Sequence, residues 1–188
     1  MNLRKKLKEQ KKNLFLYTKN ILQNSIASNM FIPHRLRKTI YRLYNHKIQG
    51  IVFPKCFLGA GKGKLIIGTN SFINYSCFLD LSNDIIIGNN VSIGFKTTFI
   101  NAFHSIGNSS ARAGQGKDLP ILIEDGCWIG ANVTIMPGVR IGKGCIIGAG
   151  SLVTKSTEPD CIYRGSSKKI KRIKITAISK YTTYLLNI

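Results

Sequence analysis

Residues 123–152 read IEDGCW IGANVT IMPGVR IGKGCI IGAGSL, which are five consecutive six-residue units that each begin with isoleucine. Four more units of this kind stand earlier, IGTNSF and INYSCF at 67–78 and IGNNVS and IGFKTT at 87–98. A fixed period is the signature of a repeat architecture, in which each turn of the chain stacks on the turn before it. The nine units therefore predict a solenoid.

Two positions within the unit indicate how each turn is built. The fifth residue is small or moderate in size, as a core beside large isoleucines requires: Ser71, Cys77, Val91, Thr97, Cys127, Val133, Val139, Cys145 and Ser151. The fourth residue is Asn or Gly in most units: Asn70, Asn90, Gly126, Asn132, Gly138, Gly144 and Gly150. Asn and Gly adopt a positive φ at the lowest cost, so a tight corner recurs in every unit. This pattern predicts a parallel β-helix with three units per triangular turn, because the strands of a β-sandwich repeat at about 8–12 residues.

The repeat frame is interrupted twice. The stretch LDLSNDII at 79–86 is longer than one unit and predicts a small insertion at a corner. The larger interruption, residues 105–121, is rich in Gly, Ser and other small polar residues, which cannot follow the coil. We expect this segment to leave the wall of the helix as a loop, and long polar loops in compact domains are often functional.

The segment FINAFH at 99–104, with IEDGCWIGANVTIMPGVRIGKGCIIGAGSLVTK at 123–155, resembles the galactoside, maltose and xenobiotic acetyltransferases of the hexapeptide-repeat family. The resemblance extends over about residues 51–175. It implies a left-handed β-helix, although parallel crossovers are normally right-handed. It also implies acetyl-CoA as co-substrate, a homotrimer with its sites between subunits, and a mechanism without a metal or a covalent enzyme intermediate.

His104 is the candidate general base. It is the only histidine within the coils, because His34 and His46 precede the repeats. It lies beside the expected loop, where a side chain can face a cleft, and an unperturbed imidazole titrates near neutrality, as a general base requires. The resemblance implies the same role, since the family's histidine at this point deprotonates the acceptor hydroxyl. The alternative is a structural or surface histidine.

The resemblance also implies binding residues. In SFINYSCFLD at 71–80 it places Asn74, and less directly Asp80, on the acceptor, and a corner residue in place of glycine is an equal alternative for Asn74. It places the following residues along the CoA: Ala131, Ala149, Thr154, Lys155, Lys169 and Arg172. Relatives carry a G-x-P-A-K-like run after the last coil, where this chain has GSSKKIKRIK at 165–174, so the choice among its cations stays open. A solvated basic tail is the alternative for that run.

The net charge of +20 is concentrated at the two ends of the chain. Residues 1–50 carry twelve Lys or Arg against one acid, and residues 155–188 carry eight against two. Such charge attracts nucleic acid, an anionic membrane or a polyphosphate alike, so it selects no function. Apolar residues at helical spacing over 3–24 predict a basic amphipathic helix, which either packs on its own trimer or lies on an anionic membrane surface. A second short helix is expected within 32–47.

Several other classes are disfavoured. A γ-class carbonic anhydrase shares the fold but needs three His ligands, whereas the coils hold only His104. No nucleic-acid partner is expected, because the coils lack the recognition signatures. The five cysteines form no CxxC pair and predict reduced core thiols, without a zinc site or a disulfide framework. No signal-peptide h-region or apolar membrane span is present, so a cytoplasmic location is expected, with the inner membrane face as an alternative.

We therefore expect a left-handed parallel β-helix at 51–165 with a loop at 105–121, a basic helical region at 1–50 and a basic tail at 166–188. The expected activity is acetyl-CoA-dependent O-acetylation of a saccharide hydroxyl on a surface polysaccharide or its precursor. The alternatives are an N-acetyltransferase acting on an amino sugar, a xenobiotic acetyltransferase and, outside catalysis, a basic β-helix that binds nucleic acid or a membrane surface.

Overall fold

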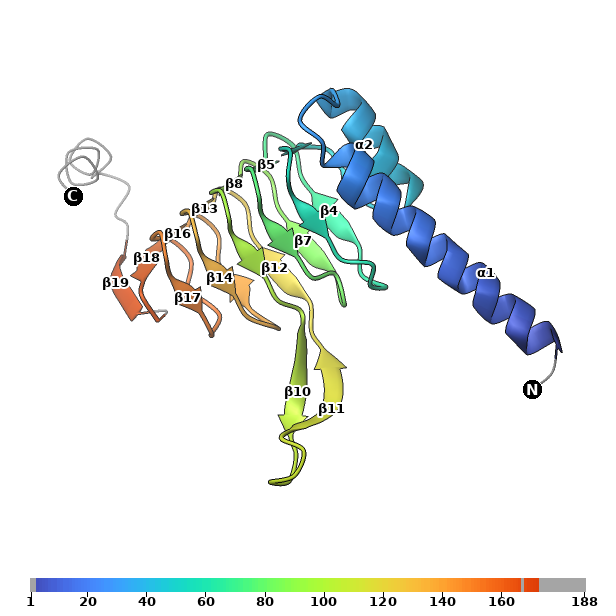
Figure 1. Cartoon of the computed structure of the whole chain (residues 1–188). Coiled ribbons are helices and arrows are strands. Elements are labelled where there is room, and N and C mark those ends of the chain that lie inside the picture. Colours follow the sequence, from blue (N-terminus) through green and yellow to red (C-terminus); the bar gives the residue numbers. More distant parts are fainter. Residues whose placement is uncertain (1–2, 167, 173–188) are drawn as a thin grey trace.

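The chain forms a short helical region followed by a column of stacked coils (Figure 1). The computed structural model describes residues 3–166 and 168–172, and the side chains of Leu3, Lys171 and Arg172 lie outside the described part. The helices are α1 (Leu3–Asn20), the π-helical η1 (Ile21–Ala27) and α2 (His34–Leu43). The amphipathic helix expected over 3–24 thus ends as an α-helix at Asn20, and its continuation as η1 was not expected.

Three parallel sheets form the sides of the column. Sheet A consists of β1 (Lys47–Ile48), β4 (Leu65–Ile67), β7 (Ile85–Ile87), β12 (Ile121–Ile123) and β15 (Arg140–Ile141). Sheet B consists of β2 (Ile51–Val52), β5 (Phe72–Ile73), β8 (Ser92–Ile93), β13 (Trp128–Ile129), β16 (Ile146–Ile147) and β18 (Cys161–Arg164), with β19 (Lys168–Arg172) added antiparallel. Sheet C consists of β3 (Phe57–Leu58), β6 (Phe78–Leu79), β9 (Thr98–Phe99), β14 (Thr134–Ile135) and β17 (Leu152–Val153). From β1 to β17, apart from the segment between β9 and β12, successive strands belong to A, B and C in turn, which is the predicted parallel β-helix.

The core is a stack of identical positions. The first isoleucine of every unit and the fifth residue of every unit are at most 2% exposed. Parallel pairing places the isoleucine of one coil beside the isoleucine at the same position of the next coil, as in Ile67 beside Ile87 and Ile87 beside Ile123. All five cysteines are buried and free, as expected. The hydrophobic effect along this continuous stack therefore holds together strands of only two or three residues.

The corners have the backbone conformation that the Asn and Gly positions predicted. Asn70, Asn90 and Asn132 have φ between 54° and 56°, and the glycines at the same position have φ between 67° and 77°. Ser76 and Lys96 occupy the corner in the remaining two units, with φ of 60° and 56°. Residues of these types rarely adopt this conformation, so the packed coils on either side hold them in it.

The segment that interrupts the repeats is an antiparallel hairpin, formed by β10 (Ala102–Ile106) and β11 (Ala113–Asp118). It leaves the column after β9 and returns before β12, and it stands off the wall (Figure 1). The expected excursion is therefore present, but it begins two residues before His104, and much of it is regular structure instead of a loop. Cross-strand hydrogen bonds satisfy the backbone groups that a free loop would leave to water.

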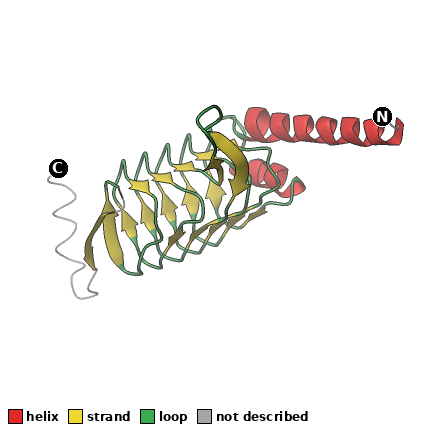
Figure 2. Cartoon of the chain, turned by 90° about the horizontal axis from the view of Figure 1, so that it is seen from below, coloured by secondary structure: helices red, strands yellow, loops and turns green. Residues whose placement is uncertain are grey.

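The helices close the N-terminal end of the column. Helix α2 packs against η1 and the first coil, where the buried guanidinium of Arg37 donates to the backbone carbonyls of four residues, Ala27, Asn29, Ile32 and Val52. Helix α1 extends beyond the first coil as a rod (Figures 1 and 2). Of the helices in the described ranges, none combines the length and the hydropathy needed to cross a bilayer.

Candidate active site

Asp80 holds the base of the β10–β11 hairpin. It directly follows β6, and its Oδ2 atom accepts hydrogen bonds from the backbone N–H groups of Asn101 (3.0 Å) and Ala102 (2.8 Å). Its Oδ1 atom accepts from the Ser82 hydroxyl at 2.5 Å. Burial raises the pKa of this carboxyl, but these hydrogen bonds outweigh burial and leave the pKa below its ordinary value. Both oxygens therefore accept hydrogen bonds from the protein, and the contact of Asp80 with the acceptor stays a prediction.

Asn101 closes the neck of the hairpin and was not among the expected site residues. Its side chain is fully buried and donates from Nδ2 to the Leu119 carbonyl at 2.9 Å, and its own carbonyl accepts from Leu119 N at 3.0 Å. Asn101 precedes β10 and Leu119 follows β11. The two strands are thus joined where they leave the column, and a single asparagine outside the repeat frame gave no signal of this.

His104 is the third residue of β10, and its side chain is exposed. Its Nδ1 atom lies 2.9 Å from the backbone carbonyl oxygen of Gly114 on the opposite strand. The residue paired with His104 is Gly116, where an added Cβ would lie 3.7 Å from the imidazole Cε1 atom. The ring therefore packs across a strand that has no side chains at these two positions.

The contact with Gly114 selects the tautomer of His104. A carbonyl oxygen can only accept a hydrogen bond, so Nδ1 carries the proton in the neutral ring. The lone pair is then on Nε2, which can accept a proton from a hydroxyl. The arrangement of an oriented imidazole with one free nitrogen is what general-base chemistry requires.

Three of the expected binding residues lie along one edge of the column, between sheets B and C. Asn74 follows β5, whereas Ala131 and Ala149 stand two residues after β13 and β16 on successive coils. Gly150 N donates to the Ala131 carbonyl at 2.8 Å, and an added Cβ at Gly130 would lie only 2.5 Å from Ala149 N. The coils are therefore in close contact here, and alanine leaves the backbone of this edge accessible.

Asn74 makes a local corner contact, and its role in binding the acceptor stays a prediction. Its Oδ1 atom accepts from Tyr75 N at 2.8 Å, which is a local corner bond. Its Nδ2 group donates to no other group in the described part of the chain, and the side chain is half-buried. A donor thus remains for a substrate oxygen.

Thr154 and Lys155 lie on a different edge. They follow β17, at the corner between sheets C and A, and both are exposed. Val153 continues a register that runs through Ile135 to Phe99, directly before the hairpin. Thr154 and Lys155 therefore lie on the same edge of the column as the hairpin. Sheet C separates them from Ala131 and Ala149.

The remaining expected cations lie in β19. The ammonium group of Lys169 forms an ion pair with the Glu158 carboxylate, and this hydrogen bond raises the pKa of Lys169. Arg172 ends β19, and its side chain lies outside the described residues. No cluster of three or more His, Cys, Asp or Glu side chains in the described ranges is arranged to hold a metal ion.

Comparison with known proteins gives consistent matches. The family model described as bacterial transferase hexapeptide (six repeats) matches residues 120–155. Galactoside O-acetyltransferase of Lactococcus lactis is 30% identical over 172 residues, which cover 91% of this chain and 81% of that protein. A Schizosaccharomyces pombe protein described as an acetyltransferase is 42% identical over 109 residues, which are 57% of this chain and 52% of the relative. The chain thus spans about half the length of that relative.

The crystal structure of a hexapeptide-repeat acetyltransferase from Vibrio cholerae, complexed with acetyl coenzyme A, superposes with a TM-score of 0.68. The two sequences are 26% identical, and the match covers 85% of this chain and 87% of the other. This similarity confirms the expected fold over most of the chain.

Proposed function

Because this chain belongs to the hexapeptide-repeat acetyltransferase family, we propose that it transfers an acetyl group from acetyl-CoA to a saccharide hydroxyl, with His104 as the general base. The observation that carries the proposal is the contact of His104 Nδ1 with the Gly114 carbonyl, which leaves Nε2 available to take a proton. The saccharide acceptor rests on the galactoside O-acetyltransferase named above, which matches nearly the whole chain.

The proposed reaction uses the free Nε2 atom of His104. His104 Nε2 takes the proton of the acceptor hydroxyl while the hydroxyl oxygen attacks the thioester carbon. The tetrahedral intermediate collapses with cleavage of the carbon–sulfur bond, and the imidazolium returns the proton to the CoA sulfur. General acid–base catalysis of this kind contributes about 10²–10⁴-fold, and positioning of the two substrates contributes the larger share.

The CoA path follows the small residues. The pantetheine arm runs beside the backbone at Ala131 and Ala149, where no side chain extends past Cβ. Thr154 and Lys155 contact CoA from the edge beside the hairpin. Lys169 and Arg172 serve the nucleotide phosphates, and Lys169 exchanges its exposed Glu158 partner for phosphate oxygens. Asn74 donates from Nδ2 to the acceptor sugar.

These residues occupy two edges of one column, so we place the site between neighbouring copies in a homotrimer. Exposed apolar side chains on the outer faces support this arrangement. On sheet C these are Phe57, Phe78 and Leu152, and Ile106 beside His104 is 88% exposed. Large exposed apolar groups on a folded wall favour an interface. Size-exclusion chromatography with light scattering tests it, and a monomeric mass would contradict it.

The activity is tested by incubating the protein with acetyl-CoA and a panel of galactosides, maltose and amino sugars, with mass spectrometry of the products. We expect CoA-dependent acetylation of a saccharide, and release of the acetyl group by mild alkali, because an ester is cleaved where an amide is not. An alkali-stable product would favour the N-acetyltransferase alternative. Absence of any acetylated product, with a surface-polysaccharide precursor included among the acceptors, would contradict the proposal. A precursor of a surface polysaccharide is the acceptor we propose to add if simple sugars are poor substrates.

A further inference from the structure

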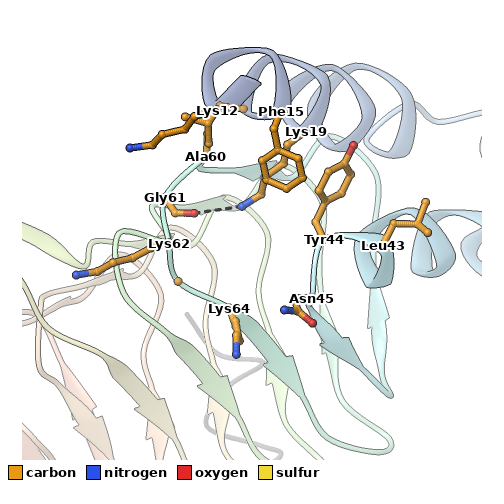
Figure 3. A pocket seen from close by; sticks show the side chains of 12 residues that line it. Lys12, Phe15, Lys19, Leu43, Tyr44, Asn45, Ala60, Gly61, Lys62 and Lys64 are labelled. Carbon is orange, nitrogen blue, oxygen red and sulfur yellow. Dashed lines mark hydrogen bonds between the residues drawn. The ribbon is translucent and has the colours of Figure 1, made fainter. Parts of the chain in front are cut away.

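A cavity of about 600 Å³ lies at the N-terminal end of the column. It is bounded by α1, by residues 43–45 after α2 and by residues 60–64 in the loop between β3 and β4 (Figure 3). Four of the twelve described residues that line it are lysines, Lys12, Lys19, Lys62 and Lys64, and none is acidic. The lining therefore has a strong positive charge.

Lys19 is the unusual member of this group, because it is only 6% exposed. Its ammonium donates to the Gly61 carbonyl at 3.1 Å, and it forms no ion pair with any described residue. Burial lowers the pKa of its ammonium group. An ammonium has three donors, so a single carbonyl leaves most of its capacity unused.

Arg37 shows how this chain compensates a buried cation elsewhere. It is 4% exposed and donates to four backbone carbonyls. A buried charge is costly unless it is paired or fully hydrogen-bonded. Arg37 meets that condition within the protein, whereas Lys19 has donors left over for an acceptor in the cavity.

The other groups around the cavity restrict what that acceptor is. Lys62 pairs with Asp118 at 3.1 Å, whereas Lys12 and Lys64 form no ion pair within the described ranges. Phe15 contributes an exposed ring to the wall, with its centroid 5.7 Å from that of Tyr44 (Figure 3). Several cations around one buried ammonium suit a group with more than one negative charge, and the aromatic wall suits a ring attached to it.

We propose that this cavity binds a phosphate ester, with Lys19 as the buried contact, Lys12 and Lys64 around the rim, and the organic part of the ligand against Phe15. Phosphate has enough acceptor oxygens to engage several ammonium groups together. The cavity lining contains none of the residues proposed for acetyl transfer, and Lys62 connects it to Asp118 at the end of β11, in the hairpin that carries His104. A soluble sugar phosphate and the phosphate of a lipid headgroup share this chemistry.

The test uses the full-length protein and inorganic pyrophosphate, with binding measured by isothermal titration calorimetry at low salt. We expect saturable binding that Lys12→Gln weakens by about fivefold or more. Lys8→Gln, one turn away on α1 and outside the cavity lining, removes the same charge and should change the affinity by less than about twofold. Lys19→Met should abolish binding, and the exposed Lys12 position keeps the test decisive if that buried variant unfolds. Equal weakening by Lys8→Gln and Lys12→Gln, or no saturable binding, would overturn the proposal.

A sedimentation assay with phosphatidylglycerol vesicles, and phosphatidylcholine vesicles as the control, identifies the source of the phosphate. Loss of vesicle binding in the Lys12→Gln protein, with retention in Lys8→Gln, assigns the site to a lipid headgroup. Equal vesicle binding by both variants, with pyrophosphate binding reduced only in Lys12→Gln, assigns it to a soluble ester.

Discussion

The Nδ1 atom of His104 lies 2.9 Å from the carbonyl oxygen of Gly114, across the two strands of the hairpin that leaves the column. The orientation and tautomer of the imidazole thus depend on the register of β10 against β11, and not on the coils directly. Any change that shifts this register should affect catalysis without affecting the fold of the column.

Two alanine substitutions on β11 test this dependence. A Cβ at Gly114 would lie 2.9 Å from the Ser105 carbonyl oxygen, so the strand must shift, whereas a Cβ at Gly116 would lie 3.7 Å or more from the nearest atoms, both in His104. We expect Gly114→Ala to lower kcat by about tenfold or more, because catalysis tolerates little misplacement of the base. Gly116→Ala should stay within about twofold of the wild type, because its contact distance is ordinary. Steady-state kinetics with unchanged melting curves provide the measurement, and equal kcat values for the two variants would count against the hairpin register as the determinant.

Asp80 offers a second test, because the anchoring role seen in the structure and the acceptor-binding role expected from the sequence predict different kinetics. As the anchor of Asn101 and Ala102, it positions the strand that carries His104. Asp80→Ala should then lower kcat by about 10²-fold while the KM for the acceptor changes less than about threefold. Asp80→Asn, which keeps an acceptor oxygen, should recover part of the rate. A large rise in KM at constant kcat would instead identify Asp80 as an acceptor-binding residue.

The coils could be predicted from the sequence because their determinants are local and repeated. Isoleucine at the first position, a small fifth residue and Asn or Gly at the corner recur often enough to give the sheets and the core. Ser76 and Lys96 could not be recognised as corners from residue type, because neighbouring coils impose their positive φ. The repeat frame alone placed them.

The candidate base and the contacts that support it were less predictable because they lie outside the repeat. His104 was found from its isolation among the coils and from the family resemblance. The Gly114 contact, the Asp80 anchor and the Asn101–Leu119 neck depend on pairing between strands whose register nothing in their composition specifies. The cavity beside Lys19 was missed for a similar reason, since it joins α1 to a loop more than forty positions later in the chain.

A stability prediction concerns the corners. Gly150 has φ +70°, and an added Cβ there would meet no atom within 4 Å, so only the backbone conformation opposes substitution. Gly150→Ala should lower the free energy of unfolding by about 1 kcal/mol, and Gly150→Asn by less, because asparagine tolerates this region. Urea denaturation measures both values, and an alanine variant as stable as the wild type would show that the corner imposes no such requirement.

His46 predicts a dependence of stability on pH. Burial, followed by the charge of Lys19, lowers its pKa from 6.5 to about 4. Its Nδ1 atom accepts a hydrogen bond from Leu65 N, which protonation of that nitrogen would abolish. The unfolded chain takes up the proton below pH 6.5 and the folded chain only near pH 4, so stability is full above pH 6.5 and is lost as the pH falls toward 4.

From pH 7 to pH 5 the loss in unfolding free energy attributable to His46 should be about 2 kcal/mol. In His46→Asn the amide oxygen can replace Nδ1 as the acceptor. This variant should lack the part of the pH dependence of the unfolding free energy that His46 contributes. His34→Asn, at an exposed position, should keep it. Urea denaturation at several pH values decides, and identical slopes for the wild type and His46→Asn would refute the assignment.

The most direct measurement is the rate at which CoA thiol is released from acetyl-CoA in the presence of a saccharide acceptor, compared between the wild type and His104→Ala. His34→Ala provides the matched control, because it removes an exposed histidine outside the coils. We predict a fall in kcat of about 10²–10⁴-fold for His104→Ala, with the fold intact and His34→Ala unaffected. Acceptor-dependent turnover that persists unchanged in His104→Ala would contradict it.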